Sequence, residues 1–336
     1  MRCLSKLPWL VPVLLATASA NASDRIGDIE FFGYKGLDIQ KLRAAVPVHG
    51  GDEYLETAAD QVRQAVTETI GKPPTDVAVI CCDERHNRLL FIGVPGDTYK
   101  PFVYNPEPRG DDRLPREIMD LYDRLGPALE AAVRKGGDAP REDDSKGYSL
   151  INDPAARSLE LAVHEWAVQH TDELMRVLRL SSWAADRRVA SDALGYARQS
   201  RQQILALVAA APDPDSEVRN NATRALGVLV RSNTALGFEI PPDTFIEMLN
   251  SGLWTDRNKS AMLLMELTAT RNPDLLARTR SGALDSLIEM AEWRRPAHAA
   301  AARLVLGRVA GIPGERLKEL VWNGPVEAIV AAARQR

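Results

Sequence analysis

The chain has 336 residues, of which 45% are hydrophobic and 26% are charged, and its formal net charge is −4. This composition is typical of a folded protein of about two domains, and it excludes wholesale disorder. The acidic balance argues against binding to nucleic-acid phosphates, which needs clustered Lys and Arg, so we expect no nucleic-acid partner.

The first 20 residues have the features of a secretory signal peptide. Arg2 and Lys6 form a positive start, residues 7–16 form a short apolar run, and Ala18-Ser19-Ala20 fits the small-residue cleavage pattern. An anchoring helix is the alternative, but two prolines interrupt a run that is too short to span a bilayer. We expect export to the periplasm or the medium, with no integral membrane segment after cleavage. Loss of the two positive charges would take the net charge from −4 to −6.

Two adjacent cysteines, Cys81 and Cys82, follow the signal. Neighbouring Cα atoms are about 3.8 Å apart, which is below the usual disulfide range, and on a strand the two side chains point to opposite faces. We interpret them as one core cysteine and one partly exposed cysteine, with a redox pair as the alternative. The sequence leaves their redox state open.

Residues 24–100 are predicted to form a small α+β domain. Residues 27–34, 77–82 and 89–94 have the β-rich pattern of strands, and two amphipathic runs between the first two predict helices at 39–46, capped by Asp38, and at 57–70. The expected order is therefore β-α-α-β-β.

That order resembles the polypeptide-transport-associated (POTRA) domain, as do a Gly-x-x-x-hydrophobic opening and Gly50-Gly51-Asp52 after the first helix. The resemblance implies docking of envelope polypeptides, in some cases by adding a strand to a sheet edge. Relatives carry the domain in tandem or beside a membrane barrel or helix, and this sequence shows none of these. Whether the front domain pairs with a strand stays open.

Residues 101–150 have the composition of a linker. They are rich in Pro, Gly and Asp at both ends, and 114–135 between them has helical spacing interrupted by Gly126-Pro127. We expect a partly ordered arm that contains a kinked helix.

Residues 151–336 contain a repeat. Four similar segments align on Ala190, Ala222, Ala261 and Ala302, with spacings of 32, 39 and 41 residues. An amphipathic helix precedes each of them, and the small residues at matching sites allow close helix packing. The unit at 212–229 resembles a HEAT repeat, an armadillo-like helical hairpin, and the others match it more loosely.

The expected fold class is therefore mostly α: a C-terminal α-solenoid of about five helical hairpins behind a small α+β domain. An irregular helical bundle is the alternative. In the HEAT family the second helix of each pair lines a concave binding face, which the resemblance implies here for 151–336. The curvature of the array and its oligomeric state are left open.

A search for chemistry finds no complete catalytic or metal-binding set. His164-Glu165-Trp166-Ala167-Val168 lacks the second histidine of a zinc-protease helix, and His170 is off-register by about 120°. The sequence has no nucleophile elbow and no Walker-type phosphate loop. We expect a protein without enzymatic activity, metal or cofactor.

Tryptophan and arginine recur at the turns that precede the second helices. Both are enriched at binding hot spots, because they make large desolvated contacts with directional bonds. The alternative is that each turn packs its tryptophan on the neighbouring repeat. The candidate binding residues are Trp183, Arg187, Arg219, Trp254, Arg257 and Trp293.

These features together predict an exported, non-catalytic scaffold that binds protein partners of the cell envelope on the concave face of a HEAT-like array. The alternative is an accessory or assembly factor of an envelope membrane machine that docks through the POTRA-like domain. The sequence does not name the partner.

Overall fold

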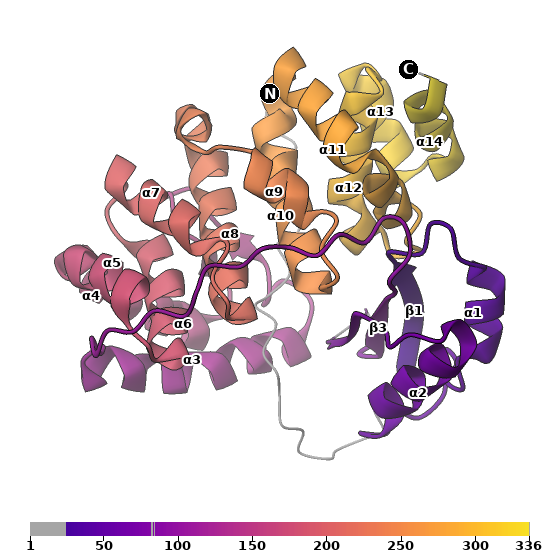
Figure 1. Cartoon of the computed structure of the whole chain (residues 1–336). Helices are drawn as coiled ribbons and strands as arrows, with labels where there is room; N and C mark the ends of the chain where they lie inside the picture. Colours follow the sequence, from indigo (N-terminus) through magenta and orange to yellow (C-terminus); the bar gives the residue numbers. More distant parts are fainter. Residues whose placement is uncertain (1–24, 82, 84, 336) are drawn as a thin grey trace. The chain divides into compact units, whose positions relative to one another are not determined.

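The computed structural model describes residues 25–335 except 82 and 84, so the expected signal peptide at 1–20 lies outside the described residues (Figure 1). Helices dominate, and a small sheet lies near the front of the chain, which confirms the expected fold class. The described chain divides into two compact units. Unit 1 is Val103–Thr244, and unit 2 combines the residues up to Phe102 with those from Phe245 onward. These units cut the chain at other places than the expected domain bounds of 24–100, 101–150 and 151–336.

The front of unit 2 has the predicted β-α-α-β-β order. Its elements are β1 (Ile26–Phe32), α1 (Ile39–Ala45), α2 (Ala58–Ile70), β2 (Asp76–Ile80) and β3 (Arg88–Gly93). The strand order is β1-β3-β2, with β1 and β3 parallel and β2 and β3 antiparallel. The last two strands therefore form a hairpin, and β2 is an edge strand.

Local signals in the sequence set the ends of these elements. The Asp38 side chain accepts hydrogen bonds from the first-turn amides of α1, and α2 ends at Gly71 in the left-handed conformation. Gly33 ends β1 with a φ of +78°, and a Cβ atom there would lie 2.3 Å from the Val94 carbonyl oxygen. Only glycine fits this turn without strain.

Both faces of the front sheet are buried. On one face, Phe31, Leu90 and Ile92 join a core cluster with side chains of α1 and α2, which lie beside the strands in Figure 1. On the other face, Phe32 and Phe91 contact the C-terminal helices of unit 2. This double burial accounts for the nearly continuous apolar sequence of β3.

The C-terminal part of unit 2 is a series of packed helices. Within it, α12 packs against α10, α11, α13 and α14. The helices are α9 (Asp243–Met248), which starts at the unit boundary, α10 (Trp254–Leu267), α11 (Pro273–Ala291), α12 (Pro296–Val309), α13 (Gly314–Trp322) and α14 (Val326–Gln335), with a 3-10 turn η3 (Thr268–Thr270).

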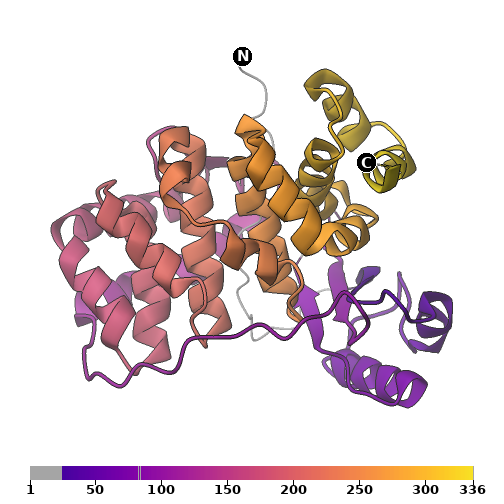
Figure 2. The same cartoon turned by 45° about the horizontal axis from the view of Figure 1, so that its top comes forward.

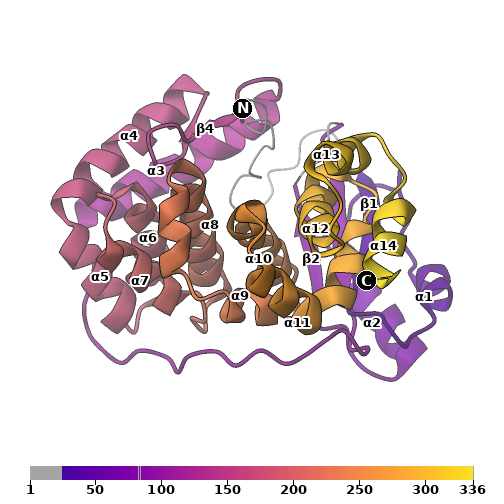
Figure 3. The same cartoon turned by 90° about the horizontal axis from the view of Figure 1, so that it is seen from above.

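Unit 1 consists of consecutive helices and one short hairpin. Its α5 packs on α6, α6 on α8, and α7 on α8, so neighbouring pairs stack side by side (Figure 3). The elements are α3 (Arg116–Lys135), β4 (Glu142–Asp143), β5 (Leu150–Ile151), α4 (Pro154–Gln169), α5 (Thr171–Leu180), α6 (Ala184–Ala193), η1 (Leu194–Tyr196), α7 (Arg201–Ala210), α8 (Ser216–Ser232) and η2 (Thr234–Glu239).

The expected linker, residues 101–150, contains a packed helix. α3 runs through Pro127 and packs against α4 and α6, burying Ile118, Leu125 and Leu129. Before it, residues 103–115 follow an extended path outside helices and strands (Figure 2). The helix belongs to the core of unit 1, although the flanking composition is that of a loop.

Cys81 follows β2, is exposed and is disulfide-bonded. The interpretation of the cysteine pair as unbonded packing residues is therefore wrong for Cys81. The chain's other cysteines, Cys3 and Cys82, lie outside the described residues.

Candidate functional site

The structure places the six candidate binding residues in very different environments. Trp183 is exposed, with 53% of its surface accessible. The other five are almost completely buried: Arg187, Arg219, Trp254, Arg257 and Trp293. Trp183 is thus the one candidate that a partner can reach in this conformation, and the binding role of the buried five stays a prediction.

The three arginines share one contact. Each donates from its guanidinium to the main-chain carbonyl six residues earlier, in the turn that joins the two helices of a hairpin. The pairs are Arg187 with Ser181 at 3.0 Å, Arg219 with Asp213 at 2.8 Å, and Arg257 with Ser251 at 2.7 Å. The repeated arginine therefore fastens each turn to the start of the second helix.

In unit 1 this arginine also reaches the neighbouring repeat. Arg187 makes a bidentate ion pair with Asp213, at 2.9 and 3.0 Å, and Asp213 lies in the turn before α8. A fully buried guanidinium needs such a partner, because an unpaired buried charge is strongly destabilising. The pair links one hairpin turn to the next.

Trp183 is held in place by a positioning network. The Arg113 guanidinium lies 4.2 Å from the Trp183 ring centroid, a cation–π geometry. Arg113 Nε also donates to the buried Asp186 carboxylate at 3.0 Å, and the Leu114 amide donates to it at 2.7 Å. Leu180, the last residue of α5, is partly exposed. Trp183, Arg113 and Leu180 form what we call the Trp183 patch.

In unit 2 the matching tryptophans pack against the front sheet. The Phe91 ring lies 5.1 Å from Trp254 and 4.9 Å from Trp293, centroid to centroid. Trp293 Nε1 donates to the Phe31 carbonyl at 3.1 Å, and the Trp254 amide donates to Asp76 at 2.8 Å. These turns cover one face of the sheet. The two tryptophans therefore pack inside the protein, as in the alternative given above, but they pack on the front domain and not on a neighbouring repeat.

Glu289 is the polar centre of this contact. Its carboxylate accepts from the Gly33 amide at 2.7 Å, the Lys35 amide at 3.0 Å and Thr98 Oγ1 at 2.7 Å. It also pairs with Arg257 at 3.3 Å. Burial lowers the pKa of Arg257 to about 10, with Glu289 opposing that shift. The front domain is therefore attached to α11 by charge-assisted bonds as well as by aromatic packing.

Unit 1 contains a cluster of buried ionisable groups. Burial raises the pKa of Glu160 to about 7, although its carboxylate accepts from the Ile151 amide at 2.6 Å. Tyr196 donates to the same carboxylate at 3.3 Å. Arg224 pairs with Glu142 at 2.5 Å, and Glu142 Oε2 has no hydrogen-bond partner among the described residues. These groups join α4, η1, α8 and the short hairpin.

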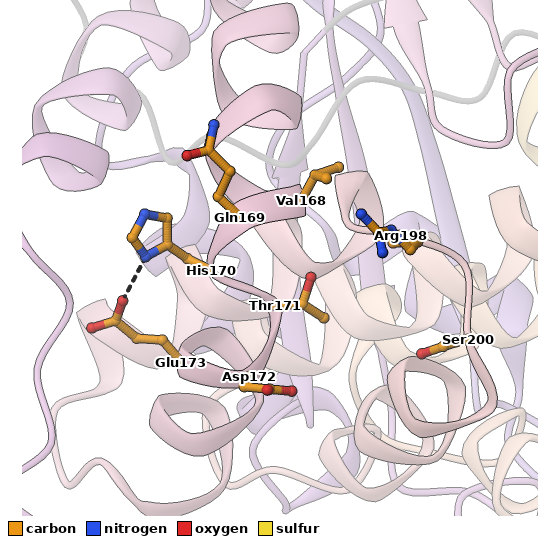
Figure 4. Close-up of a pocket in the computed structure, with 8 residues that line it drawn as sticks. All are labelled: Val168, Gln169, His170, Thr171, Asp172, Glu173, Arg198 and Ser200. Atoms are coloured by element: carbon orange, nitrogen blue, oxygen red, sulfur yellow. Dashed lines mark hydrogen bonds and ion pairs between the residues drawn. The ribbon is translucent and has the colours of Figure 1, made fainter.

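Two cavities adjoin one another near the α4–α5 turn, with volumes of about 440 and 590 Å³, and both are lined in part by His170. Figure 4 shows His170 turned toward Glu173, with a ring nitrogen 3.1 Å from the carboxylate, while Arg198 comes from the loop before α7. The His170 ring also stacks on Trp166. His164, by contrast, stacks on Tyr148 and contacts the Tyr196 carbonyl, so the two histidines face different partners.

Within the described ranges, no group of three or more His, Cys, Asp or Glu side chains is arranged to hold a metal ion. In the same part of the chain, no helix combines the length and apolarity needed to cross a bilayer. Comparison with known proteins supplies no family: no protein-family model matches the chain, and no curated protein matches it.

Sequence reasoning missed Glu289, Arg113 and the extended segment before α3. Glu289 resembles any other helix carboxylate in the sequence, because its four donors come from residues far away in the chain. Arg113 sits in a segment with the composition of a linker. The sequence did contain one useful signal, the arginine that recurs at the turns. A repeated buried arginine needs a carboxylate or carbonyl partner nearby.

Proposed function

We propose that this protein is an exported, non-catalytic scaffold that binds a protein partner through a surface centred on the Trp183 patch. The observation that carries the proposal is an exposed tryptophan whose ring is already stacked under an arginine. Such a pair offers a large contact area with little conformational entropy left to lose on binding. Its location, just before the second helix of a hairpin, suits a HEAT-like array that binds partners along its second helices.

Three further observations support this proposal. The positioning carboxylate, Asp186, is buried and fixed at the start of α6, so the patch rests on a rigid element. The cavities near His170 are more open than enclosed, which suits polypeptide contact better than enclosure of a small substrate. The signal-like N-terminus, which lies outside the described residues, motivates an envelope or extracellular partner.

Site-specific photocrosslinking in the producing cells tests the proposal. Trp183 is replaced by photoreactive p-benzoylphenylalanine, and crosslinked peptides are identified by mass spectrometry. We expect one recurring protein partner from this position. The matched control carries the same replacement at Trp322, a tryptophan of α13 that is 43% exposed. A crosslinking pattern that is the same at both positions would contradict the proposal.

Truncation of the patch gives a quantitative check once the partner is identified. Trp183→Ala should weaken partner binding by about 2 kcal/mol, or roughly 30-fold in Kd, as for other hot-spot tryptophans. Helicity by circular dichroism should stay unchanged, because the Trp183 side chain is half exposed. Trp322→Ala serves again as the control, and an equal loss in both variants would remove the special role of Trp183.

A second candidate function is an accessory factor that docks an envelope polypeptide through the front domain. The specific observation in its favour is that β2 is an edge strand of a sheet with the β-α-α-β-β order. A strand added to β2 would extend the sheet, as the POTRA resemblance implies. Recurring crosslinks from a photoreactive residue at Ala78, with none at Trp183, would favour this function over the scaffold.

A further inference from the structure

The extended segment before α3 is bound to unit 1 in the manner of a peptide ligand. Residues 103–109 lie outside regular secondary structure, and the side chains of Val103 and Glu107 are 86% and 64% exposed. The segment therefore buries little apolar surface of its own. Its position depends on polar contacts with the turns of two successive helical hairpins.

The main chain of the segment forms hydrogen bonds to the turns at two positions, five residues apart. The Asn105 amide donates to the Pro212 carbonyl, in the turn between α7 and α8, at 2.7 Å. The Gly110 amide donates to Leu180, at the turn between α5 and α6, at 2.7 Å, and the Ser182 amide returns a bond to the Gly110 carbonyl at 2.8 Å. These three bonds use backbone groups, and Asn105 Nδ2 adds a side-chain bond to the Ala209 carbonyl at 3.0 Å. A Cβ atom at position 110 would lie 2.6 Å from the Leu180 carbonyl oxygen, so a replacing segment needs a glycine at that position.

Side chains add specificity at the two turn arginines. Glu107 pairs with Arg187 at 3.2 Å, and the Tyr104 ring lies 4.2 Å from the Arg219 guanidinium. Arg187 and Arg219 occupy equivalent positions in neighbouring hairpins. Each turn thus presents one arginine, and the segment places a carboxylate on one arginine and an aromatic ring on the other.

Two of the candidate binding residues, Arg187 and Arg219, are the side chains that this segment contacts. Part of what buries them is a segment of the same chain that could leave without disrupting a helix. The bonds from Arg187 to Asp213 and to the Ser181 carbonyl would remain after it left. The arginines would stay in place, with Arg187 losing its contact to Glu107 and Arg219 losing its contact to Tyr104.

We infer that the turn surface of unit 1 is a polypeptide-binding site which residues 103–110 fill in cis, and that an extended segment of a partner replaces them. This inference rests on the proposed scaffold function and specifies the partner's chemistry: an aromatic residue followed three positions later by a carboxylate and six positions later by a glycine. The site continues into the Trp183 patch, because Gly110 is bonded to the residues on either side of Ser181.

A competition experiment on the full chain tests the inference. The probe is a fluorescein-labelled synthetic peptide with the sequence of residues 102–111, titrated by fluorescence anisotropy. In the unmodified protein the tethered segment has an effective concentration on the order of millimolar, so the free peptide should bind weakly. Tyr104→Ala combined with Glu107→Gln loosens the tethered segment and should tighten peptide binding by about tenfold or more.

The controls separate this site from general charge effects. Glu117→Gln removes an exposed carboxylate of α3 outside the segment and should leave peptide binding unchanged. A peptide carrying the same Tyr-to-Ala and Glu-to-Gln changes should not bind the loosened variant. No gain in the Tyr104 and Glu107 variant, or equal binding of the altered peptide, would overturn the inference.

Hydrogen exchange supplies a second measurement. Saturating peptide should speed exchange of the Asn105 and Gly110 amides in the full chain, because the tethered segment is displaced; unchanged exchange at saturation would contradict displacement. A dimer by light scattering would make a second copy the occupant and overturn the assignment to a foreign partner. If the peptide experiments fail but Trp183 still gives a recurring crosslink, only the inference about residues 103–110 is rejected. If the Trp183 crosslink is also absent, the scaffold function itself is rejected.

Discussion

Glu160 is a carboxylate whose surroundings oppose its ionisation. It is buried, a second carboxylate, Glu142, raises its pKa further, and Arg224 lowers it, with a net result of about 7 against an ordinary value of 4.5. The folded protein therefore binds a proton between these pH values that the unfolded chain releases. Its contribution to stability is complete below about pH 4.5 and is lost as the pH rises through 7.

Glu160→Gln should remove this pH dependence. We expect the free energy of unfolding of the unmodified protein, measured by urea denaturation, to fall relative to that of the variant as the pH rises from 4.5 to 8. The upper limit of the relative change is about 3 kcal/mol. Glu165→Gln, on the exposed face of the same helix, is the control. Parallel pH profiles for Glu160→Gln and the unmodified protein would show that Glu160 titrates normally.

Glu289→Gln tests the attachment of the front domain. The amide would leave the buried Arg257 without its charged partner, and breaking a buried pair in this way costs about 3–5 kcal/mol. Glu292→Gln, at the exposed C-cap residue just after α11, is the control. Its amide oxygen can still accept the hydrogen bond from the Tyr34 hydroxyl, so it should change stability by less than about 0.5 kcal/mol. Thermal unfolding followed by circular dichroism compares them, and similar melting temperatures for both variants would be incompatible with the proposed role of Glu289.

At the scale of helices and strands, the sequence was informative wherever the signal was local. The order of the front domain, the Asp38 cap and the hairpin before β3 all follow from residues close together in the chain. The repeating turn arginine was also visible, because its carbonyl partner lies only six residues away.

Contacts between distant segments were not predictable in this way. Trp254 and Trp293 have the same turn context as Trp183, yet they pack on a sheet more than 150 residues earlier in the chain. Nothing in their local sequence distinguishes a packed tryptophan from an exposed one. The helix α3 was assigned to a linker for the same reason, since its flanks are rich in Pro, Gly and Asp while its partners α4 and α6 follow it.

The whole molecule is organised discontinuously. Unit 1 is one continuous stretch, whereas unit 2 draws on residues both before and after it. An isolated fragment of residues 103–244 should therefore fold, with a cooperative thermal transition and native-like helicity by circular dichroism.

Residues 245–336 produced alone should not behave in this way. Without the front sheet, Trp254 and Trp293 would lose their aromatic partner Phe91, and Arg257 and Glu289 would lose their front-domain contacts. We expect that fragment to show weak helicity and to bind a dye that reports exposed apolar surface. Co-expression with residues 25–102 should restore the helicity and abolish the dye binding. A cooperative transition in the isolated 245–336 fragment would contradict this account.

The split of unit 2 also imposes an order on synthesis. The ribosome releases the front sheet first, but the helices that cover Phe32 and Phe91 are made only after unit 1, at about 5–20 residues per second. For many seconds the nascent chain carries a three-stranded sheet with one bare aromatic face, while unit 1 can close behind it. Such a chain suits either a holding chaperone or export before folding, and slowing translation between residues 103 and 244 should increase its aggregation.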